Sequence, residues 1–130
     1  MDDPIRCDPE EAMKYLCLVY VNEKKFEGFT EEDGNTLMRE SLAYDDVLRA
    51  GGHYITSNAL DSVQSAATVR VENGAAVISD GPFAETKEHL GGFILVDARD
   101  LNDAIRLATK IPMARMGCIE VRPTIELNPN

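Results

Sequence analysis

Two stretches of helical periodicity, each with short apolar runs before and after it, constrain this chain more than any other feature. The first helix is expected to begin after Thr30 and to end at Gly51-Gly52. The second is expected between Asp100 and Pro112. Hydroxyl and carboxylate caps begin helices, whereas paired glycines or a proline end them. The apolar runs are rich in Val, Ile, Leu and Tyr, which predicts strands. The chain therefore predicts an α+β fold.

Six segments are predicted as strands, and two of them form a hairpin. Asn73-Gly74 joins these two, and it is a strong hairpin signal because both residues tolerate positive φ. The first strand is an unbroken apolar run, which suits a central position in a sheet. The predicted strands cover residues 14–21, 53–58, 67–72, 75–79, 92–98 and 117–123.

Each predicted helix carries an apolar stripe that should pack on the sheet. In the first helix the stripe is expected to contain Leu37, Met38, Leu42, Val47 and Leu48. In the second helix it is expected to contain Leu101, Ala104, Ile105, Ala108 and Ile111.

The order strand, helix, strand, hairpin, strand, helix, strand is a split βαβ pattern. It predicts a ferredoxin-like antiparallel sheet with two helices on one face and an inserted hairpin. The other sheet face should carry Leu16, Val19, Phe93 and Leu95, which is too apolar for a face wholly in water. We therefore predict a homodimer that pairs two open sheet faces, forming a dimeric α/β barrel.

The 130 residues are expected to form one domain over residues 13–127. Residues 1–12 are acidic and lack an apolar period, so they are predicted to be a flexible N-terminal extension that is dispensable for folding. Met13 is a candidate natural start, and residues 128–130 are predicted to be a short tail.

The formal charge of −10 argues against a nucleic-acid partner or an anionic membrane surface. The longest apolar run is too short to span a bilayer, and we predict a cytoplasmic protein. Cys7, Cys17 and Cys118 lack the paired spacing of a disulfide framework or a zinc site. No nucleotide-loop or metal motif is recognised, so we expect neither a metal nor a cofactor.

The segment Asp80-Gly81-Pro82-Phe83-Ala84-Glu85-Thr86-Lys87 concentrates an acid, a base and a rigid turn directly after a predicted strand. Asp80 is a candidate general base at a cleft, or alternatively a turn residue beside Gly81-Pro82. His53 opens the second strand and is the other candidate proton carrier, although a structural role is the alternative.

Four further charged residues are candidates for binding a substrate, and the three cationic ones would suit an anionic substrate. Lys87 could fix a carboxylate, or it could form an exposed pair with Glu85. Arg115 and Arg122 are the other cationic candidates, and Glu120 shares a strand face with Arg122. The alternative role of Arg122 is an ion pair with Glu120 or Asp80 at a dimer interface.

The signature segment resembles that of the DGPF branch of the YCII-related proteins. The likeness extends over residues 13–127 and includes Gly52-His53-Tyr54-Ile55, Thr68-Val69-Arg70-Val71, Gly91-Gly92-Phe93 and Ile119-Glu120-Val121-Arg122-Pro123. The resemblance implies a dimeric α+β barrel, and it implies that most relatives have no assigned reaction.

The wider YCII group is associated with a histidine–aspartate pair, and a few of its members resemble lyases acting on chlorinated aromatic rings. The histidine should precede a triplet like Leu42-Ala43-Tyr44, where this chain has Ser41. The aspartate should precede Pro112, where this chain has Ile111. The resemblance therefore implies that this chain lacks the pair.

Three classes of function stay open at this point. The protein is expected to be a cofactor-free isomerase or lyase with a cleft near Asp80, a ligand-binding or regulatory module without turnover, or a structural dimer without a ligand. A titratable residue with a perturbed pKa in a cleft would favour the enzyme.

Overall fold

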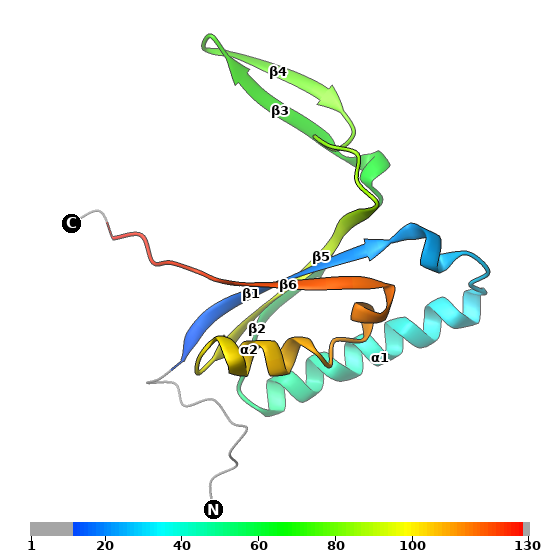
Figure 1. Cartoon of the computed structure of the whole chain (residues 1–130), viewed down its shortest axis with the longest axis vertical. Coiled ribbons are helices and arrows are strands. Elements are labelled where there is room, and N and C mark those ends of the chain that lie inside the picture. Colours follow the sequence, from blue (N-terminus) through cyan, green and yellow to red (C-terminus); the bar gives the residue numbers. More distant parts are fainter. Residues whose placement is uncertain (1–11, 129–130) are drawn as a thin grey trace, which may run out of the picture.

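The computed structural model describes residues 12–128 and contains two α-helices, six strands and three short 3₁₀ helices (Figure 1). The predicted N-terminal extension lies outside the described residues except for residue 12. None of the helices in this part of the chain is long and apolar enough to cross a membrane. The elements, in chain order, are β1 (Met13–Asn22), η1 (Glu23–Phe26), α1 (Glu31–Ala50), β2 (Tyr54–Ala59), η2 (Val63–Ser65), β3 (Ala67–Glu72), β4 (Ala75–Asp80), β5 (Glu88–Ala98), α2 (Leu101–Ala108), η3 (Pro112–Met116) and β6 (Gly117–Pro123).

Four strands form one antiparallel sheet in the order β2-β5-β1-β6, and both α-helices lie on one side of it (Figure 1). The predicted α+β class is confirmed, and this strand order is compatible with a ferredoxin-like fold. The first apolar run is a central strand as predicted, because β1 pairs with both β5 and β6. The core between sheet and helices centres on fully buried Cys17, Leu48 and Val96.

Both α-helices begin at the caps that the sequence indicates. Thr30 Oγ1 accepts a hydrogen bond from the Asp33 backbone N–H at 3.1 Å, and the Asp33 carboxylate accepts one from the Thr30 N–H at 3.0 Å. This reciprocal pair is a capping box. Asp100 caps α2 by accepting a hydrogen bond from the Asp103 N–H at 2.8 Å.

The buried stripes of the helices differ in part from the prediction. In α1, Leu37 and Leu48 are buried, but the prediction was wrong for Met38, Leu42 and Val47, each of which is more than half exposed. Residues three or four apart share a helix face, so Ser41 and Tyr44 continue the stripe of Leu37 and Leu48. In α2 the prediction is confirmed for Ala104 and Ala108, and for Ile111 just after the helix. It was wrong for Leu101 and Ile105, whose side chains are exposed, and Asp103 and Leu107 are buried in their place.

The predicted hairpin forms a separate two-stranded sheet, β3–β4, which projects away from the rest of the molecule (Figure 1). Asn73 and Gly74 at its tip have φ values of 51° and 79°. These positive values are those of a tight hairpin turn, which confirms the role that the Asn-Gly pair indicates.

Strand β5 begins four residues earlier than predicted, so it includes the glycine pair. The pairing of β1 with β5 shifts between Val19 and Tyr20, and Gly91 lies in this bulge. A Cβ atom on Gly92 would lie 2.9 Å from the Asn58 carbonyl oxygen of β2. The glycine pair thus serves both a bulge and a close approach of two backbones.

The face of the sheet opposite the helices carries half-buried Leu16, Phe93 and Leu95, as predicted. Val19 was wrongly expected there: it is 6% exposed and belongs to the core on the helix side. The alternation along β1 explains this, because residues 15, 17 and 19 share one face and residues 16 and 18 share the other.

Candidate functional site

A groove of about 490 Å³ lies between α1 and the end of the four-stranded sheet. Its walls come from α1, the facing ends of β2 and β5, and the segment around η3, together with Phe26 of η1. The lining is mainly apolar and includes Leu37, Met38, Leu42, Ile94 and Met113. Volume and apolar lining are those of a site for a small organic molecule.

Two of the exposed apolar side chains of α1 belong to this groove. Met38 and Leu42 are 61% and 59% exposed, and both line it. Ser57, Asn58 and Ala59 of β2 line it from the sheet side. Of the three exposed side chains that depart from the predicted stripe, Met38 and Leu42 are therefore explained by an open groove, whereas Val47 does not line it.

Asp45 supplies the groove with a carboxylate. It is half-buried, and burial raises its pKa above the ordinary value of 3.8. The positive charge of Arg49 opposes this rise, and the negative charge of Asp46 adds to it. Arg49 donates a hydrogen bond to Asp46 at 2.8 Å, and its guanidinium lies 4.2 Å from the centre of the Tyr54 ring. Arg49 therefore directs its hydrogen bond and its ring contact to Asp46 and Tyr54 rather than to Asp45.

Two hydroxyl groups of α1 lie on the groove beside Asp45. Ser41, one turn before Asp45, donates to the Leu37 carbonyl at 2.9 Å. Tyr44 donates to the Leu107 carbonyl of α2 at 2.6 Å, which ties the two helices together. Burial raises the pKa of Tyr44 to about 12, so its hydroxyl stays protonated and acts as a donor.

Asp80 is the last residue of β4 and is exposed, opposite Ala67 of β3. The turn after it is held by other groups: the Gly81 N–H donates to Ala66 O at 2.7 Å, and Thr68 Oγ1 donates to Gly81 O at 2.9 Å. Gly81 has a φ of 89°, which favours glycine. Asp80 therefore lies at the base of the hairpin and does not line the α1 groove.

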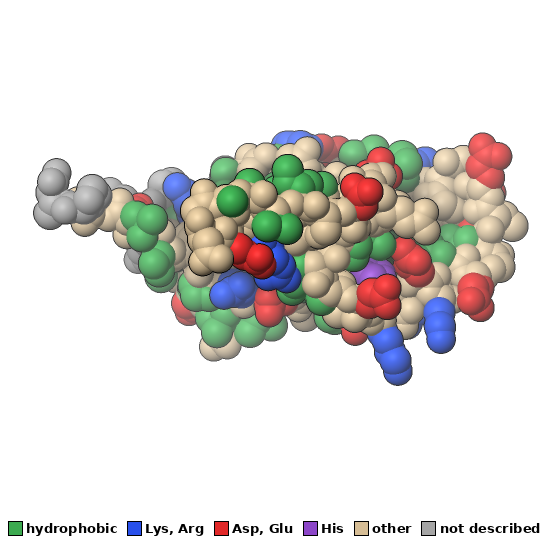
Figure 2. All heavy atoms as spheres, turned by 90° about the horizontal axis from the view of Figure 1, so that it is seen from above, with side chains coloured by type: hydrophobic (Ala, Val, Ile, Leu, Met, Phe, Trp, Pro, Cys, Tyr) green, Lys and Arg blue, Asp and Glu red, His purple; other side chains and the backbone are tan. Residues whose placement is uncertain are grey.

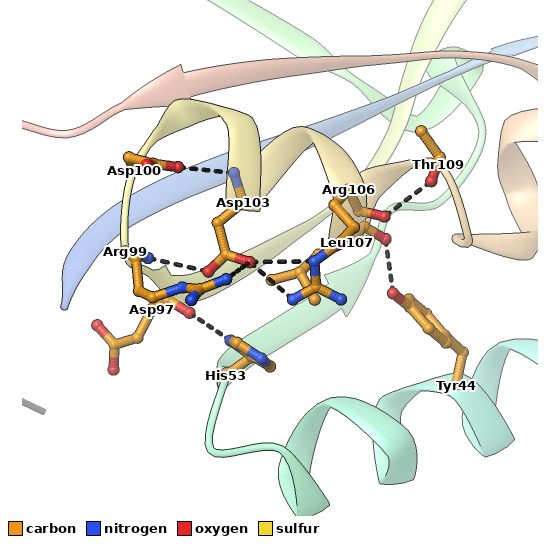
Figure 3. A network of polar contacts seen from close by, with 9 residues as sticks. All are labelled: Tyr44, His53, Asp97, Arg99, Asp100, Asp103, Arg106, Leu107 and Thr109. Atoms are coloured by element: carbon orange, nitrogen blue, oxygen red, sulfur yellow. Dashed lines mark hydrogen bonds and ion pairs between the residues drawn. The ribbon is translucent and has the colours of Figure 1, made fainter. Parts of the chain in front are cut away.

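His53 lies elsewhere, where α1 is followed by β2. It is 3% exposed, its Nδ1 lies 2.8 Å from the Asp97 carbonyl oxygen, and its backbone N–H donates to Leu48 O at 2.8 Å (Figure 3). These contacts fix the end of the helix against β5. The structure does not bring His53 and Asp80 into one cleft, and their proposed chemistry stays a prediction.

Lys87 and Glu85 line a polar depression together with Lys24, Glu23 and His89. The two lysines come from the signature loop and from η1, which follows β1. Acids and bases are mixed there, so the depression carries little net charge. Binding of an anionic group by Lys87 stays a prediction.

The other predicted cationic residues lie apart from Lys87. Arg115 donates to Glu40 of α1 at 2.8 Å, an exposed ion pair that connects η3 to the helix. Glu120 and Arg122 are exposed on the open face of β6, opposite Leu18 and Leu16 of β1. Their shared strand face is as predicted.

A cluster around Asp103 lies at the start of α2, and none of Arg99, Asp103 and Arg106 lines the α1 groove (Figure 3). The Asp103 side chain is 2% exposed and accepts hydrogen bonds from Arg106 Nη2 at 2.7 Å and from the Arg99 backbone N–H at 3.0 Å. Burial alone would raise the pKa of Asp103, but these donors outweigh it and lower the pKa to about 2. The cluster is a fully bonded anchor for the start of α2.

Asp45 is the site residue that the sequence analysis did not identify. A signal for it existed, because Leu37, Ser41, Tyr44, Asp45 and Leu48 share the spacing of one helix face. An acidic residue on a buried stripe indicates either a buried partner or a ligand site. Within residues 12–128 no three His, Cys, Asp or Glu side chains are arranged to hold a metal ion.

Comparison with known proteins identifies the family. The sequence pattern of the YCII-related domain matches residues 13–128, which is nearly the whole described chain. The chain belongs to the YCII-related family. It is also 34% identical over 113 residues to the uncharacterised protein R00369 of Rhizobium meliloti (strain 1021), covering 85% of this chain and 91% of that protein.

The two positions that the family resemblance singles out both lie on the groove. Ser41 and Ile111 line it from α1 and from the residue before η3. Ser41 is half-buried and Ile111 is 6% exposed. At these two positions of the groove this YCII-related chain therefore has the hydroxyl of Ser41 and the apolar side chain of Ile111. The carboxylate in the groove comes from Asp45.

Proposed function

We propose that this YCII-related protein binds a small, largely apolar organic molecule in the α1 groove and transfers a proton through Asp45. The observation that carries the proposal is a desolvated carboxylate in an apolar groove of ligand size. A carboxyl group with a raised pKa is a better proton donor and acceptor near neutral pH than an ordinary one. Proton transfer of this kind suits an isomerase or lyase that needs no cofactor.

The apolar walls favour a ligand with an aromatic or branched aliphatic body. Leu37, Met38 and Leu42 offer one apolar wall, and the glycine pair of β5 offers a flat backbone surface on the other side. Asp45, Ser41 and Ser57 supply the few polar groups that would orient the ligand. We therefore expect one hydrogen-bonding group on an apolar molecule rather than a highly charged metabolite.

A thermal-shift screen of small phenols, amides, alcohols and carboxylic acids tests the proposal. The wild-type protein is compared with Asp45→Asn and with Asp46→Asn, which changes the neighbouring, exposed carboxylate. We expect a compound that raises the melting temperature of the wild type and of Asp46→Asn, but not of Asp45→Asn. Absence of binding at millimolar concentrations, or equal shifts in all three proteins, would contradict the groove as the site.

The earlier prediction of a cleft near Asp80 is tested in the same screen with Asp80→Asn. A compound whose effect disappears in Asp80→Asn and persists in Asp45→Asn would place the site at the signature loop. Turnover of a bound compound, followed by NMR, separates an enzyme from a binding module. Loss of turnover with retained binding in Asp45→Asn is expected for proton transfer by this residue.

A further inference from the structure

The charge of the α1 groove comes from a single side chain. Among the described residues that line the groove, Asp45 is the only one charged at neutral pH, and no Lys, Arg or His belongs to this lining. Tyr44, the other titratable residue of the lining, stays neutral because burial raises its pKa to about 12. A ligand in the groove therefore lies beside one carboxylate and meets no basic side chain of the lining.

The arginines that form ion pairs with α1 side chains use acids other than Asp45. Among residues 12–128 these ion pairs join Arg39 to Glu32, Arg49 to Asp46, and Arg115 to Glu40. The charge of Arg49 lowers the pKa of Asp45, but burial, which raises it, is the larger influence. Burial of a carboxylate without a paired cation is costly, so a positively charged group on the ligand would stabilise this carboxylate.

The hydroxyl groups beside Asp45 offer acceptors rather than donors. Ser41 Oγ already donates to the Leu37 carbonyl at 2.9 Å, and the Tyr44 hydroxyl donates to the Leu107 carbonyl at 2.6 Å. Ser41 and Asp45 are four residues apart on α1, so they share one face of the helix. The remaining lone pairs of Ser41 Oγ and the carboxylate oxygens of Asp45 are therefore acceptors on one wall of the groove. An ammonium group matches them, because it has three N–H donors and no acceptor.

The charge of the whole chain also favours a cation. The chain carries a formal charge of −10, and acidic side chains are spread over the face seen in Figure 2 instead of forming one patch. A field of this sign attracts cations and repels anions, over about 8 Å at physiological ionic strength. A carboxylate ligand would be repelled both by this field and by the charge of Asp45.

We propose that the ligand of the α1 groove is a protonated primary amine with a small aromatic or branched aliphatic body, whose ammonium group pairs with Asp45. The apolar body lies against Met38 and Leu42, and the ammonium group donates to Asp45 and to Ser41 Oγ. This inference rests on the proposed function, because it names the class of ligand for the same groove. It does not depend on proton transfer by Asp45.

Isothermal titration calorimetry of the full chain at pH 7 tests the charge of the ligand. Phenethylamine, phenethyl alcohol and phenylacetate share an aromatic body and differ in their polar group, and isoamylamine and isoamyl alcohol supply a branched aliphatic body. We expect each amine to bind about tenfold more tightly than its alcohol, and phenylacetate to bind more weakly than phenethyl alcohol. Equal binding of amines and alcohols would overturn the amine but keep the groove as a ligand site. No binding of any probe at millimolar concentrations would contradict both.

Two variants test the ion pair with Asp45. Asp45→Asn keeps the shape of the side chain and removes its charge, and Asp46→Asn removes the charge of the exposed neighbour. We expect phenethylamine to bind about tenfold more weakly to Asp45→Asn, with phenethyl alcohol changed less than about twofold, and neither probe affected by Asp46→Asn. Circular dichroism checks that both variants are folded. An equal loss of amine binding in both variants would indicate attraction to the net charge of the chain and would overturn the pairing with Asp45.

Methionine methyl signals in NMR spectra locate the bound amine. In protein isotopically labelled at these methyl groups, phenethylamine should shift the signals of Met38 and Met113, which line the groove. Met13 and Met116 do not line it and serve as internal controls. Shifts confined to Met13 or Met116 would place the amine outside the groove and overturn the proposal.

Discussion

Asp103 on α2 and Asp45 on α1 show how differently one fold treats two carboxylates. Asp103 is the more buried of the two, yet its pKa falls to about 2, because two arginines and a backbone N–H donate to it. Asp45 is only half-buried, yet its pKa rises, because burial is its largest influence and Arg49 donates to Asp46 instead. Hydrogen-bond donors, rather than depth alone, therefore decide which carboxylate is structural and which is available to a ligand.

The largest expected effect comes from removing the charge of Asp103. Asp103→Asn keeps the shape but loses the charge that Arg99 and Arg106 share, so we expect a loss of about 2 kcal/mol in the free energy of unfolding at pH 7. Urea denaturation measures it. Asp46→Asn is the control, because its ion pair is well exposed and should contribute less than about 1 kcal/mol. An equal loss of unfolding free energy in both variants would contradict the prediction that the hydrogen-bonded, buried Asp103 contributes more to stability than an exposed acid.

The contribution of Asp103 to stability should also depend on pH. The pKa of Asp103 is depressed from 3.8 to about 2, so its contribution is present above pH 4 and is lost as the pH falls toward 2. The stability difference between wild type and Asp103→Asn should therefore shrink steadily from pH 5 to pH 2. Thermal unfolding across this range checks it. A difference that stays constant with pH would mean that Asp103 acts through its shape alone.

The sequence predicted the elements of this fold better than their packed faces. The caps at Thr30 and Asp100 and the Asn73-Gly74 turn are local signals, and each is confirmed at its position. The burial of α1 is not local. The helix has more apolar residues than one face can hold. Only its packing against β2 and η3 decides that Leu37 is buried while Met38 lies at the rim of a groove.

The candidate site was harder to predict than the fold for the same reason. A motif such as Asp80-Gly81-Pro82-Phe83 is visible because its residues are consecutive, but the groove draws its lining from several separate elements. Asp45 lies in no motif and gains its raised pKa from burial that only the folded chain creates. The signature, in turn, lies at the base of an exposed hairpin, where its sequence alone does not show what it contacts.

A smaller loss of stability is expected from a change at the contact between α1, which carries Asp45, and α2, which carries Asp103. Tyr44 lies beside Asp45 on α1 and donates to Leu107 of α2, which carries the Asp103 cluster (Figure 3). Tyr44→Phe removes this 2.6 Å hydrogen bond and leaves the Leu107 carbonyl with only the longer, 3.3 Å bond from the Lys110 N–H, so we expect a loss of about 1 kcal/mol, measured by urea denaturation. Tyr54→Phe, which removes a hydroxyl bonded to Ser57 within β2, is the matched control. An unchanged stability in Tyr44→Phe would show that the helices are held together by apolar packing alone.

The smallest effect should have the opposite sign. Because the folded protein raises the pKa of Asp45, the charged form costs stability at neutral pH, and Asp45→Asn should gain about 0.5 kcal/mol at pH 7. As the pH falls through the raised pKa of the folded state, Asp45 takes up a proton and the cost disappears. It is fully gone below the unfolded pKa of 3.8, so this gain should vanish below pH 4. Urea denaturation at pH 7 and pH 3.5 measures the gain, and carbon-detected NMR titration of the side-chain carboxyl measures the pKa directly. A pKa below 3.8, or a loss of stability at pH 7, would place Asp45 with Asp103 among the anchored acids and would remove the proton-transfer residue from the groove.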